Sequence, residues 1–114
     1  MGEPQFVSMS ELRQFTLADG ATAQALFGEQ AMLNLVELAP HARVPRHSHP
    51  HEQLGVVLLG ELTLETSDGE HVLRPMDAYT LPGDIEHEAV AGPEGALVLD
   101  VFQPIREDYR SAAT

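Results

Sequence analysis

Two histidines placed two positions apart, His47 and His49, have a spacing that suggests metal chemistry. On an extended chain, side chains two positions apart point to the same face, so both imidazoles can approach one ion. For zinc the distance would be about 2.0–2.1 Å per nitrogen. Gln53 follows with the same parity, and His87 lies just past a Pro-Gly-Asp turn. Three imidazoles and a carboxamide oxygen form a neutral site that suits a divalent transition metal better than calcium or magnesium.

The neighbouring residues leave a second ligand set open. His51 and Glu52 could bind the metal in place of His49 and Gln53, or could simply be solvated. The two remaining histidines are expected at the surface: His41 and His71.

The elements that position these residues are predicted to be short strands, because Gly or Pro interrupts the chain every ten to fifteen residues. Apolar and alternating runs predict strands at 31–38, 53–59, 61–66, 71–73, 77–81 and 96–102. A hairpin turn is expected at 67–69, and the segment 9–17 fits a short helical turn or an edge strand equally well. Many short strands in a small chain predict an all-β sandwich or a closed barrel. We favour the barrel because closure removes exposed edges.

Composition excludes several kinds of partner and of catalytic group. The 114 residues suffice for one domain, and six basic against 18 acidic residues give a net charge of -12. This charge disfavours nucleic acid and anionic membrane surfaces as partners. All six basic residues are Arg, so no lysine can form a Schiff base. The absence of cysteine excludes disulfides, thiolate zinc sites, iron–sulfur clusters and a cysteine nucleophile.

Neither a membrane-spanning segment nor a signal peptide is expected from the sequence. The longest aliphatic run, residues 56–59, is too short to span a bilayer. The first ten residues lack the basic start and apolar stretch of a signal peptide, which leads us to expect a cytoplasmic protein.

The stretch from residue 41 to 60 resembles the first motif of the cupins: glycine, five residues, HxH, three or four residues, Glu, six residues, Gly. His47, His49 and Gly60 match it, while Gln53 stands in place of the Glu and His41 in place of the first glycine. The second cupin motif, glycine, five residues, PxGxxH, three residues, Asn, falls on residues 76–91. Its matches and replacements are as follows: Pro82 and His87 match, and Met76, Asp84 and Ala91 replace the two glycines and the asparagine.

Asp84 can still take the left-handed turn that a glycine would supply, at some cost in energy. The resemblance implies an all-β, small single-domain barrel of the double-stranded β-helix or jelly-roll type, with one metal ion inside. The implied ligands are His47, His49, Gln53 and His87, and the ion could be nickel, iron, manganese, zinc or copper.

Within a single cupin domain covering 1–114, we expect an N-terminal strand or arm at 1–20, a barrel core at 31–103 and a C-terminal tail at 104–114. We also expect a homodimer. A barrel this small leaves an apolar face in need of cover, and cupins of this size often pair through N-terminal strands.

The run LDVFQPIREDY at 99–109, taken with HSHPHEQ and VLLGEL, resembles the KdgF group of cupins, which act in pectin degradation. Members of that group open the ring of 4,5-unsaturated monouronates to give linear keto-deoxyuronates. The resemblance implies a functional set beside the metal: Asp100, Phe102 and Arg106.

These residue types suit such a reaction. Asp100 and Phe102 share one face of a strand, and an Asp in an apolar strand needs a partner or a role. Arg106 would bind the substrate carboxylate through its planar fork, and Asp100 would move a proton as the ring opens. The alternative for Asp100 is a salt bridge with Arg106. Phe102 would pack against a sugar face or belong to the core.

Three functions are therefore weighed. The first is ring opening of an anionic sugar acid, the second a metal-dependent dioxygenase, and the third a cupin that binds a small molecule without catalysis. Asp100 together with Arg106 favours the first, because an apolar aromatic substrate would not need that pair.

Overall fold

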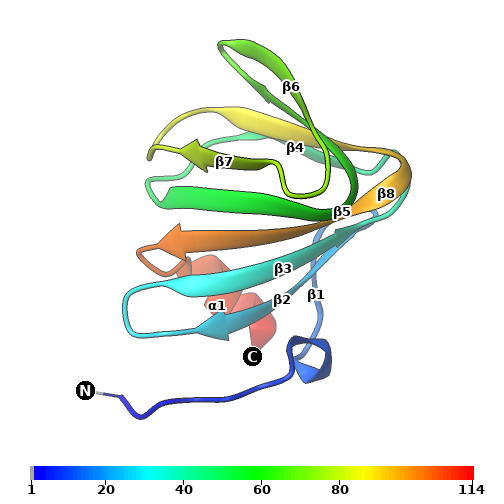
Figure 1. The fold of residues 1–114 in the computed structure, drawn as a ribbon. Coiled ribbons are helices and arrows are strands. Elements are labelled where there is room, and N and C mark those ends of the chain that lie inside the picture. The colour runs from blue at the N-terminus through cyan, green and yellow to red at the C-terminus, as the bar shows by residue number, and fades with distance from the viewer. Residues whose placement is uncertain (1) are drawn as a thin grey trace.

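Eight β-strands form one curled antiparallel sheet in a computed structural model that describes residues 2–114 (Figure 1). In chain order the elements are η1 (Met9–Glu11), β1 (Phe15–Ala18), β2 (Ala21–Phe27), β3 (Met32–Leu38), β4 (Arg43–His47), β5 (Glu52–Thr66), β6 (Gly69–Leu73), β7 (Ala78–Leu81), β8 (His87–Gln103) and α1 (Glu107–Ala113). The undecided segment at 9–17 therefore contains both a helical turn, η1, and the start of a strand, β1.

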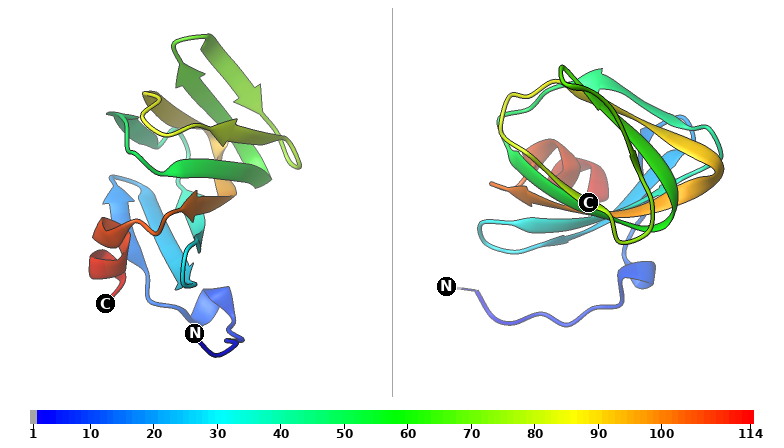
Figure 2. Two further views of the ribbon diagram at one scale, coloured as in Figure 1. Left: turned by 90° about the vertical axis from the view of Figure 1, so that its left-hand side faces the viewer. Right: turned by 45° about the horizontal axis from the view of Figure 1, so that its top comes forward.

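The order of the strands explains how the sheet curls. Neighbours follow the sequence β1-β2-β3-β8-β5-β6, while β4 also pairs with β8 and β7 also pairs with β5. The long strands β5 and β8 thus each belong to two parts of the sheet, which wraps around a common axis (Figure 2). This arrangement confirms the predicted all-β class. Among residues 2–114, no helix is long and apolar enough to cross a membrane.

Residues 53–59 and 61–66 belong to one strand, β5, and not to two strands as expected. The register between β5 and β8 shifts on both sides of Gly60, whose φ of 77° is the left-handed conformation that glycine adopts without strain. A Cβ there would lie 2.1 Å from the carbonyl oxygen of Gly95. Gly60 therefore bends β5 without ending it, so one end pairs with β7 and the other with β6.

Two strands and the final helix were not indicated by the sequence. β2 buries three alanines, a residue type depleted in strands, and β4 carries a proline in its middle. Both strands belong to the barrel. β2 precedes the core expected at 31–103, and β4 lies within that range. The C-terminal segment expected at 104–114 contains the buried Ile105 and Arg106, followed by α1.

The apolar core lies inside the curled sheet. Its largest members come from β1, β3, β5 and β8 together with the segment before α1: Phe15, Met32, Val36, Leu38, Val57, Leu62, Val98, Phe102 and Ile105. Alternate residues of β3 and β8 face this interior. The polar residues that share this interior face are therefore buried too, which places them in the site described next.

Candidate metal centre and cavity

Three imidazoles meet at one end of the barrel. His47 is the last residue of β4 and His87 the first of β8, and these two are direct partners in the antiparallel register. His49 lies in the loop that follows β4 and not on an extended strand. Its side chain still meets those of His47 and His87, but the alternation of side chains along a strand is not the reason. One ring nitrogen from each histidine lies within 4.8 Å of one from each of the other two.

All three imidazoles are oriented by hydrogen bonds to backbone carbonyls. Nδ1 of His47 lies 2.8 Å from the carbonyl oxygen of Pro45, and Nδ1 of His87 lies 2.8 Å from that of Ile85. Nδ1 of His49 lies 3.1 Å from the carbonyl oxygen of His51. Because each Nδ1 donates its proton to a carbonyl, each Nε2 keeps a lone pair for a metal ion.

Gln53 supplies the fourth donor atom at the same place. Its side chain is buried, and its Oε1 lies 3.1 Å from Nε2 of His49. Glu52 is exposed, and His51 is outside the histidine cluster. The structure thus brings together His47, His49, His87 and Gln53, and not the alternative pair. His41 and His71 are exposed, as expected.

The charge state of the histidines suits metal binding. Burial lowers the pKa of His49 to about 4, with the charges of Arg106 and His87 acting in the same direction. Burial also lowers the pKa of His87. Both rings are therefore neutral at neutral pH, which is the form that coordinates a metal.

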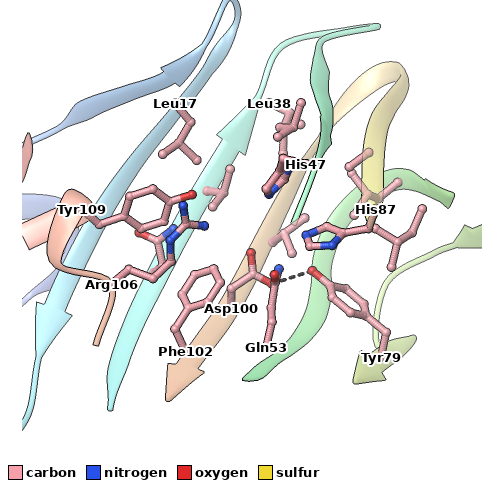
Figure 3. A pocket seen from close by; sticks show the side chains of 17 residues that line it. Leu17, Leu38, His47, Gln53, Tyr79, His87, Asp100, Phe102, Arg106 and Tyr109 are labelled. Atoms are coloured by element: carbon pink, nitrogen blue, oxygen red, sulfur yellow. Dashed lines mark hydrogen bonds between the residues drawn. The ribbon is translucent and has the colours of Figure 1, made fainter. Parts of the chain in front are cut away.

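A cavity opens from this cluster toward the C-terminal segment (Figure 3). His47 and His87 lie at one end and Arg106 and Tyr109 at the other, while Asp100 and Gln53 lie side by side between them. The cavity therefore joins the histidine cluster to every residue implied by the C-terminal signature.

Asp100 is buried in this cavity and accepts a hydrogen bond of 2.5 Å from the Tyr79 hydroxyl. Burial raises the pKa of Asp100 to about 6, although hydrogen bonds from Tyr79 and Gln53 and the charge of Arg106 oppose the rise. Burial and the charge of Asp100 raise the pKa of Tyr79 well above its usual value, so Tyr79 stays protonated. Asp100 can therefore gain or lose a proton near neutral pH while Tyr79 remains its donor.

Arg106 is held by three neighbours. Its Nε and Nη2 donate to the two carboxylate oxygens of Asp108, at 3.3 and 2.9 Å. Its guanidinium carbon lies 3.8 Å from the ring centroid of Tyr109 and 5.2 Å from that of Phe102. The alternative salt bridge with Asp100 is not formed, because Arg106 pairs with Asp108 instead.

Phe102 belongs to the core, which is one of the two readings given to it. It belongs to the apolar core and is almost fully buried, and it also forms part of the cavity wall. Its ring packs edge-on against the rings of His49 and Tyr109, with centroids 5.5 and 5.7 Å apart. Phe102 thus links the histidine cluster to the segment that carries Arg106.

Three polar residues that line the cavity were not predicted from the sequence: Asn34, Tyr79 and Tyr109. A signal existed for two of them. Asn34 is a polar residue on the otherwise apolar, buried face of β3. Gly55 is one of two glycines within β5, and a glycine inside a strand often marks a close approach of another group; Tyr79 is its partner on β7.

The match to a known protein family covers both of the motifs that contain the histidines. The cupin domain family matches residues 34–102, which is more than half of the chain. The chain belongs to the cupin family. This cupin is 27% identical over 95 residues to the pectin degradation protein KdgF of Dickeya dadantii, covering 82% of the chain and 86% of KdgF. It is also 38% identical over 88 residues to the dimethylsulfoniopropionate lyase DddW of Ruegeria pomeroyi, covering 75% of the chain and 54% of DddW. The chain thus spans about half the length of DddW.

Solved structures agree on the fold. KdgF from Halomonas sp. has a TM-score of 0.86 and 28% identity, and covers 94% of this cupin and 99% of its own chain. An RmlC-like cupin from Shewanella frigidimarina has a TM-score of 0.85 and 27% identity, with 94% and 96% covered. These likenesses confirm the expected cupin fold and the expected resemblance to KdgF.

Proposed function

We propose that this cupin is a metal-dependent isomerase that opens the ring of 4,5-unsaturated monouronates from pectin or alginate breakdown to give linear keto-deoxyuronates. One observation carries the proposal: Asp100 and Arg106 line the same cavity as His47 and His87. A group that moves protons and a group that binds carboxylates thus stand beside the candidate metal centre. The likeness to KdgF over most of both chains supports the same activity.

The donor set fits a divalent transition metal. Three neutral imidazoles with free Nε2 atoms and one amide oxygen converge, and His47, His49, His87 and Gln53 would hold the ion. When bound, the metal supplies a Lewis acid that polarises a substrate oxygen. These ligands do not distinguish nickel, iron, manganese, zinc and copper.

Arg106 would bind the substrate carboxylate. The net charge of -12 repels an anion, so capture needs a local positive group. Asp108 accepts hydrogen bonds from Nε and from Nη2 of Arg106. No residue within 2–114 accepts a hydrogen bond from Nη1, which is therefore available to a ligand. The stacked ring of Tyr109 fixes the plane of the guanidinium. Arg106 therefore offers its Nη1–Nη2 edge, a geometry that matches a carboxylate.

Asp100 would move the proton. During ring opening the anomeric hydroxyl loses a proton, the ring C–O bond breaks to give an aldehyde and an enolate, and the enolate carbon gains a proton to leave a ketone. No atoms are gained or lost overall, so one carboxyl group with a pKa near 6 can serve both transfers. The hydrogen bond from Tyr79 holds the Asp100 carboxylate toward the cavity, which makes Tyr79 a positioning residue.

The test follows the loss of absorbance of the conjugated double bond in an unsaturated monouronate, using metal-loaded protein. Wild type should accelerate the decay over buffer. Arg106→Lys keeps the charge but loses the fork, so KM should rise about tenfold or more with a smaller change in kcat. Arg110→Lys is the matched control, since Arg110 is exposed and pairs with Glu107. Metal-loaded wild type that is no faster than buffer would exclude the proposal and favour a dioxygenase or a binding protein.

Cleavage of dimethylsulfoniopropionate is the second candidate, favoured by the 38% identity to DddW. That substrate is also a carboxylate, so Arg106 would bind it in the same way. Release of dimethyl sulfide from dimethylsulfoniopropionate by the same preparation, without turnover of the monouronate, would replace the first proposal by this one.

A further inference from the structure

Asn34 is a buried polar residue that the proposed reaction does not yet use. It lies on β3, and only 1% of its surface is exposed. Neither its Nδ2 nor its Oδ1 has a hydrogen-bond partner among residues 2–114. Burying an amide without partners is unfavourable for folding, so such a group in a native interior calls for an explanation.

The position of Asn34 directs it toward the cavity. It shares the inner face of β3 with Val36 and Leu38, and all three line the cavity that contains the histidine cluster. Its register partner on β2 is Ala25, which offers no hydrogen bond. Its register partner on β8 is Asp100, whose Oδ1 accepts from Tyr79 and to which the Asn34 amide makes no hydrogen bond. The amide is thus left for whatever enters the cavity.

The chemistry of the amide indicates its ligand. It presents two N–H donors and a carbonyl acceptor, so it complements a group that both accepts and donates, as a hydroxyl does. Side chains that face each other on paired strands are neighbours, which places the amide beside the carboxylate that moves the proton. A ligand that satisfies Asn34 must therefore carry a polar group next to its reacting part.

We infer that Asn34 binds a ring hydroxyl of the substrate and so acts as a positioning and specificity-determining residue; the inference rests on the proposed function. A monouronate carries hydroxyl groups on the ring, whereas dimethylsulfoniopropionate has none. Asn34 would then favour hydroxylated acids, because a ligand without a hydroxyl leaves the buried amide unpaired.

The test compares Asn34→Leu with wild type. Leu has a similar size but no polar atoms, so it removes the unpaired amide from the folded protein and the hydrogen bonds from the complex. We expect a higher melting temperature together with about a tenfold lower kcat/KM for the monouronate, mainly through KM. Asn34→Thr keeps a hydroxyl on a β-branched side chain and should recover part of the lost activity. If Asn34 served only to stabilise the fold, its replacement by Leu would not raise the melting temperature.

The outcomes separate the two proposals. If wild type turns over the monouronate and Asn34→Leu has the same kcat and KM, the role of Asn34 is refuted and the proposed function stands. A lower melting temperature in both variants would also refute it, because Asn34 would then be structural. Lack of turnover by metal-loaded wild type would overturn both proposals together.

Discussion

The Tyr79 hydroxyl reaches the Asp100 carboxylate across Gly55, the residue of β5 that is paired with Tyr79 on one side and with Asp100 on the other. A Cβ at Gly55 would lie 2.3 Å from the Tyr79 ring and 2.4 Å from Oδ1 of Asp100. The missing side chain is therefore what lets β7 supply a donor to a carboxylate on β8.

Gly55→Ala should disconnect Tyr79 from Asp100. The added methyl group occupies the space of the hydrogen bond, so we expect kcat to fall about tenfold or more and the melting temperature to fall by several degrees. Metal content, measured by elemental analysis, should stay the same. Tyr79→Phe is the companion variant, since it removes the hydroxyl without a clash and should lower kcat with a smaller loss of stability. Unchanged kcat in both variants would show that the contact has no catalytic role.

Metal removal should destabilise the protein. A ligand that binds the folded state raises its stability, so chelation should lower both the melting temperature and the monouronate activity, and added metal should restore them. His49→Ala removes one of four donors and should lower metal occupancy. His71→Ala, an exposed histidine outside the cluster, serves as control. Full occupancy in His49→Ala would contradict the ligand assignment.

Asp100→Asn should separate turnover from stability. Asn keeps the shape and can still accept the Tyr79 hydrogen bond, but it cannot carry the proton. We expect kcat to fall by a factor on the order of 10²–10⁴ with metal binding preserved. Loss of metal in this variant would point to a structural part for Asp100 in the centre.

In the metal-free protein, the difference in stability between wild type and Asp100→Asn should depend on pH. The pKa of Asp100 is raised from 3.8 to about 6 on folding, so the folded state binds this proton more tightly than the unfolded chain does. Wild type should therefore lose stability relative to Asp100→Asn as the pH rises from about 4 to 6. Above that range the difference should level off at roughly 2–3 kcal/mol. Denaturant unfolding at several pH values measures it, and a difference that grows toward acid pH would contradict the burial effect.

Within residues 2–114, three non-glycine residues have a positive φ, and each stands where a cupin motif has glycine: His41, Met76 and Asp84, with φ of 61°, 74° and 67°. This conformation costs roughly 1–2 kcal/mol for a residue with a Cβ. Met76→Gly and Asp84→Gly should each raise the free energy of unfolding by about 1 kcal/mol, seen as a higher melting temperature. Gly60→Ala is the converse control and should destabilise. A loss of stability in both glycine variants would mean that side-chain contacts outweigh the strain.

We predict that the protein is a homodimer. Residues 2–8 form no strand with the barrel and run beneath it, and the Phe6 side chain is 93% exposed (Figure 1). A second chain would cover the exposed side chains of Phe6 and Val7. Light scattering should give twice the 12.4 kDa of one chain, and Phe6→Ser should shift the mass toward a monomer. A wild-type mass equal to one chain at micromolar concentration would refute the dimer.

Much of the barrel could be predicted because β3, β6 and β7 carry ordinary strand patterns between turns. β4 could not, since Pro45 breaks its pattern and its pairing depends on distant β8. In the turn before His87, Asp84 takes the left-handed conformation that the motif required. Tyr79 was missed because its role depends on Gly55 and Asp100 meeting it from two other strands, which local pattern does not reveal.

The length and position of β8 also affect how the molecule is made. This strand is the shared partner of β3, β4 and β5, and it carries His87 near one end and Asp100 near the other. During synthesis β3, β4 and β5 emerge before the strand that joins them, and their open edges must wait for it. The last metal ligand and the proton-transfer group both arrive with β8, so the growing chain keeps an open, association-prone sheet until this one strand has paired.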